Sequence, residues 1–431
     1  MKLLDQLQER WSGSNEPFLI HQGTELRFSD LASGDRVDLS AVQAGDVVAL
    51  IGDFEPTSIA CVVHLIDLRA ILVPLTKETK QDHEYFFETA CVDVVIENGV
   101  ARRVTHNSNN PYIKQLRDIG HAGLVLFSTG TTGRPKGILH DMTLFLQRFN
   151  QPRPTFRTLN FLLFDHIGGI NTLLHTMFNR GVVISPSERS VQGVLDTCRN
   201  YQVEVLPTTP TFLRMLLMSG MLPDCFPSSV KVVTYGTERM DQPTLAALCE
   251  LLPEVDFRQT FGMSELGILR VKSEARDSLF MKIGGTGVET RVDDGVLKIR
   301  SATRMVGYLN APSPFDSDGW YDTKDIVEMK GDLIKVTGRV SDVINVGGLK
   351  FMPSEIERHA LEFPGVQQAK AFARENPITG QHVELLVESA TGNDIDLTGL
   401  KQLLTEKLQP HMVPRRIKMG GIEVGHRFKK K

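Results

Sequence analysis

The segment Ser128-Thr129-Gly130-Thr131-Thr132-Gly133-Arg134-Pro135-Lys136-Gly137 follows directly after the apolar run GLVLF, residues 123–127. Glycines let a backbone approach phosphate oxygens closely, hydroxyl groups can donate hydrogen bonds to them, and Arg134 and Lys136 supply positive charge. No Gly-Lys-Ser/Thr triplet occurs here, which disfavours a Walker-type P-loop. A polar surface loop is the alternative, but ten positions of this type after a buried strand favour a triphosphate-binding loop.

Outward from this loop, short runs rich in Val, Ile and Leu predict strands that are covered on both faces, as in parallel sheets. These runs are residues 46–53, 70–75, 123–130, 181–186, 203–210 and 230–237. Between them, apolar residues recur every three or four positions and predict helices over 56–69, 191–201, 210–220 and 242–252. The alternation predicts an α/β fold with a large N-terminal domain built on parallel-type sheets.

After about residue 285 the segments become shorter and alternate in polarity, which predicts antiparallel strands. A second unit begins near Gly338, where Ser354-x-x-Glu357 is expected to form a capping box that opens a helix. Strands over 368–374 and 381–389 and a helix over 397–408 are expected to follow. We therefore expect a large domain over 1–338 and a small α+β domain over 339–431.

Composition excludes several classes of protein. The chain has 431 residues, with 48 Lys and Arg against 52 Asp and Glu, so its formal charge of -4 provides no basic field for nucleic acid. Five scattered cysteines without a Cys-x-x-Cys pair indicate reduced thiols. The N-terminal stretch has no uninterrupted apolar region, and no run is long enough to span a membrane. These features predict a cytoplasmic protein without membrane insertion.

The sequence resembles the adenylate-forming enzymes, which include acyl- and aryl-CoA synthetases, luciferase-like enzymes and peptide-synthetase adenylation domains. STGTTGRPKG matches the signature loop of that family at every position, and further matches follow in the order of the family along nearly the whole chain. Residues 26–31 and 44–75 look like its opening α/β unit in shortened form. The resemblance implies a trimmed rather than truncated enzyme, shortened before Ser128, with a mobile C-terminal domain.

The segment FRQTFGMSELG, residues 257–267, resembles the family motif that contacts the nucleotide. By this resemblance Phe261 packs on adenine beside Gly262, the hydroxyl of Ser264 meets the α-phosphate, and Glu265 holds Mg²⁺. A carboxylate suits this hard cation, and ligands gather at the carboxyl ends of strands in open α/β sheets. Taken alone, Phe261 would be a core residue and Glu265 a solvated charge.

Other matches imply further nucleotide contacts. Tyr235-Gly236-Thr237-Glu238 resembles the adenine-binding turn, although a plain turn is the alternative, and Asp325 matches the carboxylate that accepts both ribose hydroxyls. Lys324 replaces the usual glycine before that aspartate, which puts the local backbone geometry in question. By the same resemblance, Arg339 contacts the nucleotide.

The interdomain segment and the C-terminus carry the remaining matches. The turn at Ser341-Asp342 resembles the hinge of the family, and Gly347-Gly348 would line the tunnel that admits a pantetheine thiol. Lys429 aligns with the lysine that bridges carboxylate, ribose and α-phosphate, with Lys430 as the competing register. A solvated basic tail is the alternative interpretation.

His166, in FDHIGG at 164–169, resembles the residue that gates the carboxylate site, although histidines in polar turns are often structural. Asp165 lies too early to match the aspartate that binds the substrate ammonium in amino-acid-activating relatives, so we do not expect an amino acid substrate.

The resemblance implies activation of an aryl or medium-chain carboxylic acid with ATP and Mg²⁺, followed by transfer of the acyl group to the thiol of coenzyme A. In this hypothesis Ser128, Thr129, Gly130, Thr131, Thr132, Gly133 and Lys136 bind the phosphates, and Lys429, Thr129, Lys136, Glu265 and His166 serve catalysis. One alternative acceptor is the phosphopantetheine of an acyl carrier protein, or an amine. A different class would be a non-catalytic protein that binds nucleotide or acyl adenylate.

Overall fold

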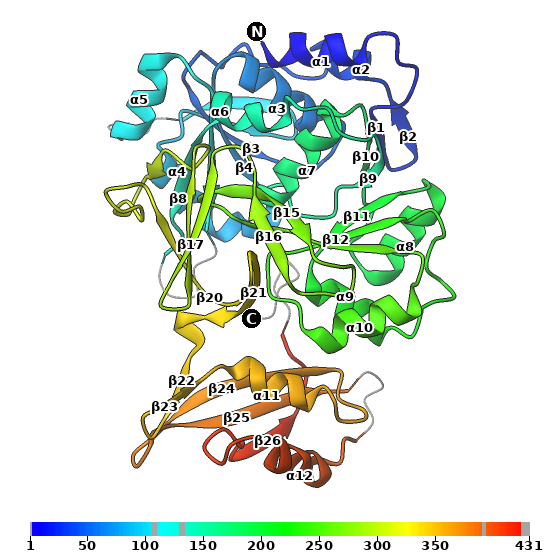
Figure 1. Ribbon diagram of the computed structural model, residues 1–431. Coiled ribbons are helices and arrows are strands. Elements are labelled where there is room, and N and C mark those ends of the chain that lie inside the picture. The colour runs from blue at the N-terminus through cyan, green and yellow to red at the C-terminus, as the bar shows by residue number, and fades with distance from the viewer. Residues whose placement is uncertain (1, 105–109, 129–133, 390–393, 424–431) are drawn as a thin grey trace.

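The computed structural model describes residues 2–104, 110–128, 134–389 and 394–423. A large N-terminal α/β domain and a smaller C-terminal domain share the chain, as predicted (Figure 1). Within the described residues the large domain contains three seven-stranded sheets, which we name A, B and C.

Sheet A is the sheet that carries the candidate site. Its strands run in the order β13-β12-β11-β9-β10-β1-β2, parallel from β13 to β1, with β2 antiparallel at the edge. The strands are β1 (Leu19–His21), β2 (Thr24–Leu26), β9 (Arg157–Leu159), β10 (Val182–Ser185), β11 (Val205–Thr208), β12 (Val232–Tyr235) and β13 (Asp256–Gln259). The parallel arrangement confirms the prediction from the continuous apolar runs.

Sheet B leads, at the end of β7, into residues 128–137, the predicted triphosphate-binding loop, which we call the phosphate-loop segment. Its order is β19-β8-β7-β4-β3-β5-β6, and the four strands from β7 to β5 are parallel. The strands are β3 (Val47–Ile51), β4 (Ile71–Leu75), β5 (Val94–Glu97), β6 (Val100–Arg103), β7 (Gly123–Phe127), β8 (Gly137–Asp141) and β19 (Gly307–Tyr308).

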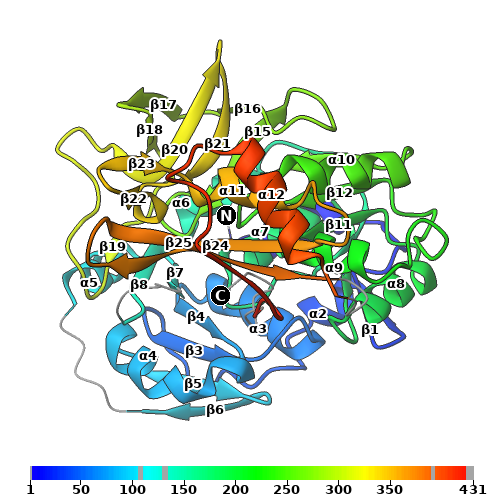
Figure 2. The ribbon, with the colours of Figure 1, turned by 90° about the horizontal axis from the view of Figure 1, so that it is seen from below.

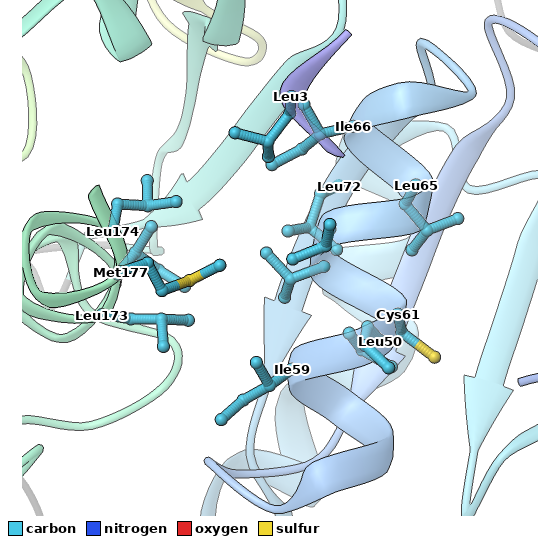
Figure 3. Packing of buried hydrophobic residues seen from close by; sticks show 14 of the residues in the cluster. Leu3, Leu50, Ile59, Cys61, Leu65, Ile66, Leu72, Leu173, Leu174 and Met177 are labelled. Carbon is cyan, nitrogen blue, oxygen red and sulfur yellow. The ribbon is translucent and has the colours of Figure 1, made fainter. Parts of the chain in front are cut away.

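Two helices, α3 (Pro56–Asp67) and α7 (Ile167–Phe178), pack against each other within the core shared by sheets A and B. Leu173, Leu174 and Met177 of α7 point toward the α3 side of this core (Figure 3). Each fully buried side chain of this size contributes about 1.5–3 kcal/mol relative to its exposed state, so this face of α7 is firmly fixed.

Helices also cover the outer faces of both sheets. The core on the outer face of sheet A includes residues of α8 (Val191–Asn200), α9 (Pro210–Met218) and α10 (Gln242–Leu251), and that of sheet B includes residues of α4 (His83–Ala90) and α5 (Pro111–Ile119). The remaining short helices of this domain are α1 (Leu3–Trp11), α2 (Phe28–Ala32), η1 (Lys77–Asp82), α6 (Met142–Leu146) and η2 (Gln147–Phe149).

Sheet C is antiparallel, as the alternating segments predict, with the order β14-β15-β16-β21-β20-β18-β17. Its strands are β14 (Phe261–Met263), β15 (Gly267–Ser273), β16 (Met281–Gly284), β17 (Val288–Asp293), β18 (Val296–Ser301), β20 (Tyr321–Lys330) and β21 (Leu333–Arg339). β21 leads through η3 (Val340–Asp342) into the C-terminal domain.

The C-terminal domain lies below the large domain in Figure 1 and crosses in front of it in Figure 2. Its separate core joins residues of a three-stranded sheet, a hairpin and two helices. The elements are β22 (Ile344–Val346), β23 (Leu349–Phe351), α11 (Pro353–Ala360), β24 (Gln368–Asn376), β25 (Gly380–Glu388), α12 (Leu397–Lys407) and β26 (Arg416–Met419).

The predicted capping box at Ser354 is wrong. Helix α11 begins at Pro353, so Met352 is its N-cap, and no side chain caps it. Ser354 instead donates a 3.0 Å hydrogen bond to the carbonyl of Thr337, and Glu357 accepts from the amide of Ala371 at 3.1 Å. Proline fits the first helical position, and the helix therefore starts two residues earlier than a cap at Ser354 implies.

Contacts between the two domains are also polar. Arg239 pairs with Glu357 at 3.2 Å, and Nε2 of Gln368 lies 3.4 Å from the sulfur of Met218.

The five cysteines are free. In the described part of the chain, no helix combines the length and hydrophobicity that crossing a membrane requires.

Candidate active site

A cavity of about 430 Å³ lies between α7 and the inner face of sheet A. Sheet A forms one wall of this cavity. Side chains two residues apart on a strand point to the same face, so alternate residues of its strands line the cavity. That wall is formed by Thr158, Val205, Pro207, Val232, Thr234 and Arg258. The neighbouring residues Leu206, Val233, Tyr235 and Phe257 point to the opposite face and join the outer core.

The helix wall begins at a tight turn. Nδ1 of His166 accepts a 3.0 Å hydrogen bond from the amide of Gly168 and so caps α7. A Cβ atom at Gly169 would lie 2.1 Å from the carbonyl oxygen of Leu163, so the turn requires glycine there. His166 lines the cavity, which is compatible with the predicted gate, and its capping bond fixes the orientation of the ring.

The phosphate-loop segment starts at one end of the cavity, which Ser128 lines. The amide of Ser128 donates to the carbonyl of Lys136, and the amide of Lys136 donates to Oγ of Ser128, both at 3.0 Å. These two bonds close the base of the loop. Thr129, Gly130, Thr131, Thr132 and Gly133 lie outside the described residues.

The segment after the loop is held by two polar side chains. The carbonyl of Pro135 accepts hydrogen bonds from the hydroxyl of Tyr85 at 2.8 Å and from the amide group of Asn310 at 3.1 Å. Oδ1 of Asn310 also accepts from the amide of Gly137 at 3.0 Å. The loop is therefore braced where it returns to sheet B.

Glu265 lies in the turn between β14 and β15, and it lines the cavity together with Gly262 and Ser264. Oε1 of Glu265 accepts a 2.7 Å hydrogen bond from the hydroxyl of Tyr308, and Nζ of Lys136 lies 4.7 Å from the centre of the Tyr308 ring. Burial and the charge of Glu265 raise the pKa of Tyr308, which keeps the phenol protonated as a donor. Tyr308 thus links the carboxylate to the lysine of the phosphate-loop segment.

Two further side chains, from His140 and Arg148, bind backbone carbonyls of the turn that carries Glu265. Nε2 of His140 lies 2.6 Å from the carbonyl of Ser264, and burial lowers the pKa of His140 to about 4, so the neutral ring is the donor. Arg148 donates to the carbonyls of Leu266 and Thr303 at 2.6 and 2.8 Å. Burial lowers the pKa of Arg148 to about 10.

Sequence reasoning did not identify Tyr308, His140 or Arg148. Their roles depend on contacts that span 43, 124 and 118 residues of the chain. The one available signal is polarity, because His140 ends the apolar run GILH at 137–140, which forms a fully buried strand. A buried histidine requires a partner, although the sequence does not show which one.

Asp325 and Arg339 are brought together by the pairing of β20 and β21. Nε of Arg339 lies 3.1 Å from Oδ1 of Asp325, and Arg339 also lines the cavity. Burial raises the pKa of Asp325, and the charge of Arg339 opposes this effect. Lys324 has a positive φ of 61°, so the backbone keeps the conformation that a glycine would adopt, despite the substitution.

In the predicted adenine-binding turn, residues 235–238, the side chains of Tyr235 and Glu238 are directed away from the cavity. Tyr235 is buried in the outer core of sheet A, and Oε1 of Glu238 accepts a 2.7 Å hydrogen bond from the amide of Thr211 in α9. Thr237 lines the cavity, and a Cβ atom at Gly236 would lie 2.1 Å from Oγ1 of Thr260. The backbone turn is thus the part available to a ligand.

The structure does not gather every predicted residue at the cavity. Phe261 packs against the core of sheet C, and Gly347 and Gly348 form the exposed turn of the β22–β23 hairpin. Both glycines have positive φ values, 62° and 89°, and no described atom lies near a Cβ built at either. Ser341 and Asp342 lie in η3, while Lys429 and Lys430 lie outside the described residues.

The donor set at this end of the cavity suits a nucleotide. Thr237 Oγ1 is buried and finds no hydrogen-bond partner among the described residues, Arg339 provides a cation, and Asp325 and Glu265 provide carboxylate oxygens. Glu265 also offers the oxygen ligand that Mg²⁺ prefers. In the described ranges no group of three or more His, Cys, Asp or Glu side chains gathers as a ready metal site.

Comparisons with known proteins agree with this geometry. The sequence profile of the AMP-binding enzyme family matches residues 31–295. The 4-coumarate--CoA ligase 3 of Arabidopsis thaliana is 25% identical over 342 residues, 71% of this chain and 61% of the relative. The fatty acid--[acyl-carrier-protein] ligase MmaC of Mycobacterium marinum is 27% identical over 322 residues, 65% of this chain and 59% of the relative. The chain thus spans about three fifths of the length of such relatives.

Solved structures share the fold. The anthranilate CoA ligase AuaEII, in complex with anthranoyl-AMP, has a TM-score of 0.81 at 19% identity and covers 100% of this chain and 95% of its own. The amide bond synthetase McbA from Marinactinospora thermotolerans has a TM-score of 0.78 at 21% identity, with 98% and 96% coverage. ATP-bound MatB from Rhodopseudomonas palustris has a TM-score of 0.82 at 19% identity, with 99% and 96% coverage.

Proposed function

The chain belongs to the AMP-binding enzyme family, and from this premise we propose that it activates a carboxylic acid with ATP to an acyl adenylate. One observation carries the proposal. A hydroxyl, a carboxylate and a guanidinium, from Ser128, Glu265 and Arg339, line the same cavity, which continues between α7 and sheet A. Nucleotide-binding chemistry and a slot for a small acid are therefore adjacent.

In the first half-reaction a carboxylate oxygen of the acid forms a bond to the α-phosphorus of ATP. The bond between that phosphorus and the bridging oxygen to the β-phosphate breaks, and pyrophosphate leaves with the electron pair. The protein aligns the two reactants and neutralises charge, as in other phosphoryl-group displacements. Activation replaces oxide, a poor leaving group, by AMP, a good one.

The roles proposed for individual residues are those that the family resemblance implies, and each one fits the chemistry of its side chain. Ser128, Thr129, Thr131, Thr132 and Lys136 hold the departing pyrophosphate, together with the backbone of Gly130 and Gly133. Glu265 holds Mg²⁺, which would neutralise phosphate charge when bound. Asp325 accepts from the ribose, and Lys429 bridges the acid and the α-phosphate, since lysine carries a compact charge on a flexible stem.

The second half-reaction transfers the acyl group to a thiol, and we propose coenzyme A as the acceptor. The thiolate attacks the carbonyl carbon, the bond to the phosphate oxygen breaks, and AMP leaves while the thiol proton passes to solvent. The units 1–338 and 339–431 would move relative to each other about Ser341-Asp342 between the two steps. MmaC and McbA make a carrier-protein thiol and an amine the alternative acceptors.

Acid-dependent exchange of labelled pyrophosphate into ATP tests the first half-reaction. We expect exchange with at least one acid of a broad panel, and its loss in Glu265→Gln but not in the control Glu254→Gln, an exposed glutamate outside the cavity. Intact nucleotide binding without exchange for any acid would favour the non-catalytic alternative. Adding coenzyme A, a phosphopantetheinylated carrier protein or an amine to the active acid then identifies the acceptor.

A further inference from the structure

The cavity has a polar helix wall. The side of α7 that faces it carries His166, Asn171, Thr172, His175, Thr176 and Asn179, whereas the opposite side carries the apolar residues of the core. Because α7 follows β9 and runs back along sheet A, its N-terminal end lies at the carboxyl edge of the parallel strands, where Thr237 lies. Its C-terminal end lies at the opposite edge, remote from the nucleotide residues.

Most polar groups on this wall are already committed to the helix. The hydroxyls of Thr172 and Thr176 donate to the carbonyls of Gly168 and Thr172, each at 2.8 Å. Oδ1 of Asn179 accepts from the amide of Arg153 at 2.6 Å, and its Nδ2 donates to the carbonyl of His175 at 2.7 Å. Of these residues, Asn179 is the C-cap of α7.

Asn171 and His175 differ from their neighbours. Within the described residues neither side chain has a hydrogen-bond partner, although both line the cavity and lie one helical turn apart. Burial and the nearby charge of Arg153 lower the pKa of His175, so the neutral ring offers one donor and one acceptor. Across the cavity, Thr208 has a buried hydroxyl that is likewise unpartnered in the described part of the chain.

The charges along the cavity restrict what these groups can recognise. The charged residues among the described lining are Arg258, Glu265 and Arg339. Arg258 pairs with Asp256 at 2.6 Å and Arg339 with Asp325 at 3.1 Å, so neither guanidinium of the described lining is free to bind a second carboxylate of a substrate. Arg153, whose charge acts on His175, does not line the cavity. The single lining carboxylate, Glu265, lies at the nucleotide end, so a remote ammonium would lack an ion-pair partner.

We infer that the substrate is a small carboxylic acid with an uncharged hydrogen-bonding substituent, such as a hydroxyl, remote from the reacting carboxylate. Asn171 and His175 are the residues that recognise this substituent. The inference rests on the proposed adenylation and deepens it. Asn171 and His175 are half-buried, and an apolar chain end packed against them would remove their remaining water without offering a hydrogen bond, which penalises such a substrate.

Cavity dimensions support a short acid. A volume of about 430 Å³ is near the lower end for ligand pockets. A helical rise of 1.5 Å per residue places Asn171 roughly 8 Å, and His175 roughly 13 Å, along the axis from His166. A six-carbon chain or a single ring with a terminal hydroxyl matches the shorter of these two distances, at Asn171. The side chain of His175, one turn further along, contacts the same hydroxyl because helical side chains are directed back toward the N-terminus of the helix.

A series of acids of equal chain length tests the inference. Acid-dependent pyrophosphate exchange is measured with hexanoate, 6-hydroxyhexanoate, adipate and 6-aminohexanoate, and with benzoate and 4-hydroxybenzoate. We expect kcat/KM for the hydroxylated acid to exceed that for its plain partner by about tenfold or more in at least one series, and the charged acids to be poorer than 6-hydroxyhexanoate. Exchange that favours plain or charged acids overturns this inference alone, whereas no exchange with any acid overturns the proposed function as well.

Variants assign the recognition to the two side chains. His175→Leu and Asn171→Leu are each expected to lower kcat/KM for the hydroxylated acid by about 10- to 100-fold while that for the plain acid stays equal or rises. His175→Gln, which keeps a donor and an acceptor, should retain part of the preference. Asn200→Leu, at an exposed helical asparagine outside the cavity, is the control. Equal losses for both acids in these variants, or unchanged preference in both leucine variants, would refute the assignment.

Discussion

The hydroxyl of Tyr308 donates a 2.7 Å hydrogen bond to Oε1 of Glu265, and the same ring lies 4.7 Å from Nζ of Lys136. One aromatic side chain thus orders the proposed magnesium ligand and a proposed phosphate ligand, which come from segments 129 residues apart by their numbers, 136 and 265. Tyr308 is therefore a positioning residue for Glu265 and Lys136. Substitution can remove its hydroxyl alone or the hydroxyl together with the ring.

Tyr308→Phe removes the hydroxyl and keeps the ring. Losing a hydrogen bond to a charged group costs about 1.5–3 kcal/mol, so we expect at least about a tenfold lower kcat/KM for MgATP in pyrophosphate exchange. Tyr308→Leu, which also removes the ring beneath Lys136, should be worse. Tyr201→Phe, at a tyrosine that does not line the cavity, is the control, and wild-type kinetics in Tyr308→Phe would contradict the role of the hydroxyl.

His140 makes stability depend on pH. Its pKa is about 4 in the folded protein against an ordinary value of 6.5, so below pH 6.5 the unfolded chain binds a proton that the folded protein does not. The free energy of unfolding therefore falls as pH drops from about 6.5 to 4, by about 3 kcal/mol from this group. Denaturant titrations of wild type and His140→Gln should diverge over this range, since glutamine keeps a donor and does not titrate; parallel curves would refute the prediction.

Arg148 supports the turn that carries Glu265. Arg148→Met leaves the carbonyls of Leu266, Ile268 and Thr303 without their donor, and we expect a loss of about 3 kcal/mol in the free energy of unfolding. Arg270→Met, at an exposed position of β15 in the same hairpin, should change it by less than about 0.5 kcal/mol. Chemical denaturation compares the two, and similar midpoints would contradict a supporting role for Arg148.

Lys324 occupies a left-handed backbone conformation beside Asp325. Lys324→Gly should leave the midpoint of thermal unfolding unchanged or raise it, because the exposed ion pair with Asp322 contributes about 0–1 kcal/mol and a lysine with positive φ is strained by about the same amount. Lys324→Val should lower stability by about 1–2 kcal/mol. Lys330→Val, on the same strand, is the control; a neutral Lys324→Val would show that the strain is absent.

Lys429 and Lys430 compete for one role. Lys429→Ala should abolish formation of the acyl adenylate, measured by pyrophosphate exchange, far more than thioester formation from a supplied acyl adenylate. Lys430→Ala is the matched control, and a reversed pattern would assign the role to Lys430. Equal loss of both half-reactions in Lys429→Ala would instead show that this lysine is not specific to adenylation.

Local sequence patterns predicted the strands and helices well because their signals are local. The run 46–53 contains β3, because a strand that is buried on both faces requires consecutive apolar residues. The periodic segment 56–69 contains α3, because a helix with a buried side requires apolar residues every three or four positions. The start of α11 differs from the prediction because Pro353 takes the first helical position and Met352, rather than Ser354, is the N-cap. Here Pro353 alone, rather than the four-residue pattern Ser354-x-x-Glu357, determined where the helix begins.

The candidate site was predictable only where a short motif carries its chemistry. Ser128 and Glu265 belong to such motifs, whereas His140, Arg148 and Tyr308 act through partners far along the chain. Asn171 and His175 carry no signal of their own, because their exposure to a cavity depends on the order β11-β9-β10 in sheet A. That order brings Thr158 and Thr234 opposite α7, and no local pattern encodes it.

Helix α7 has consequences for how such a protein can diversify. Leu173, Leu174 and Met177 anchor one side of the helix, while Asn171 and His175 project from the other. Substitutions on the cavity side leave the anchor untouched, so a lineage or an engineer can exchange them one at a time without first acquiring compensating changes. Ligand preference is thereby separated from folding within a single twelve-residue element.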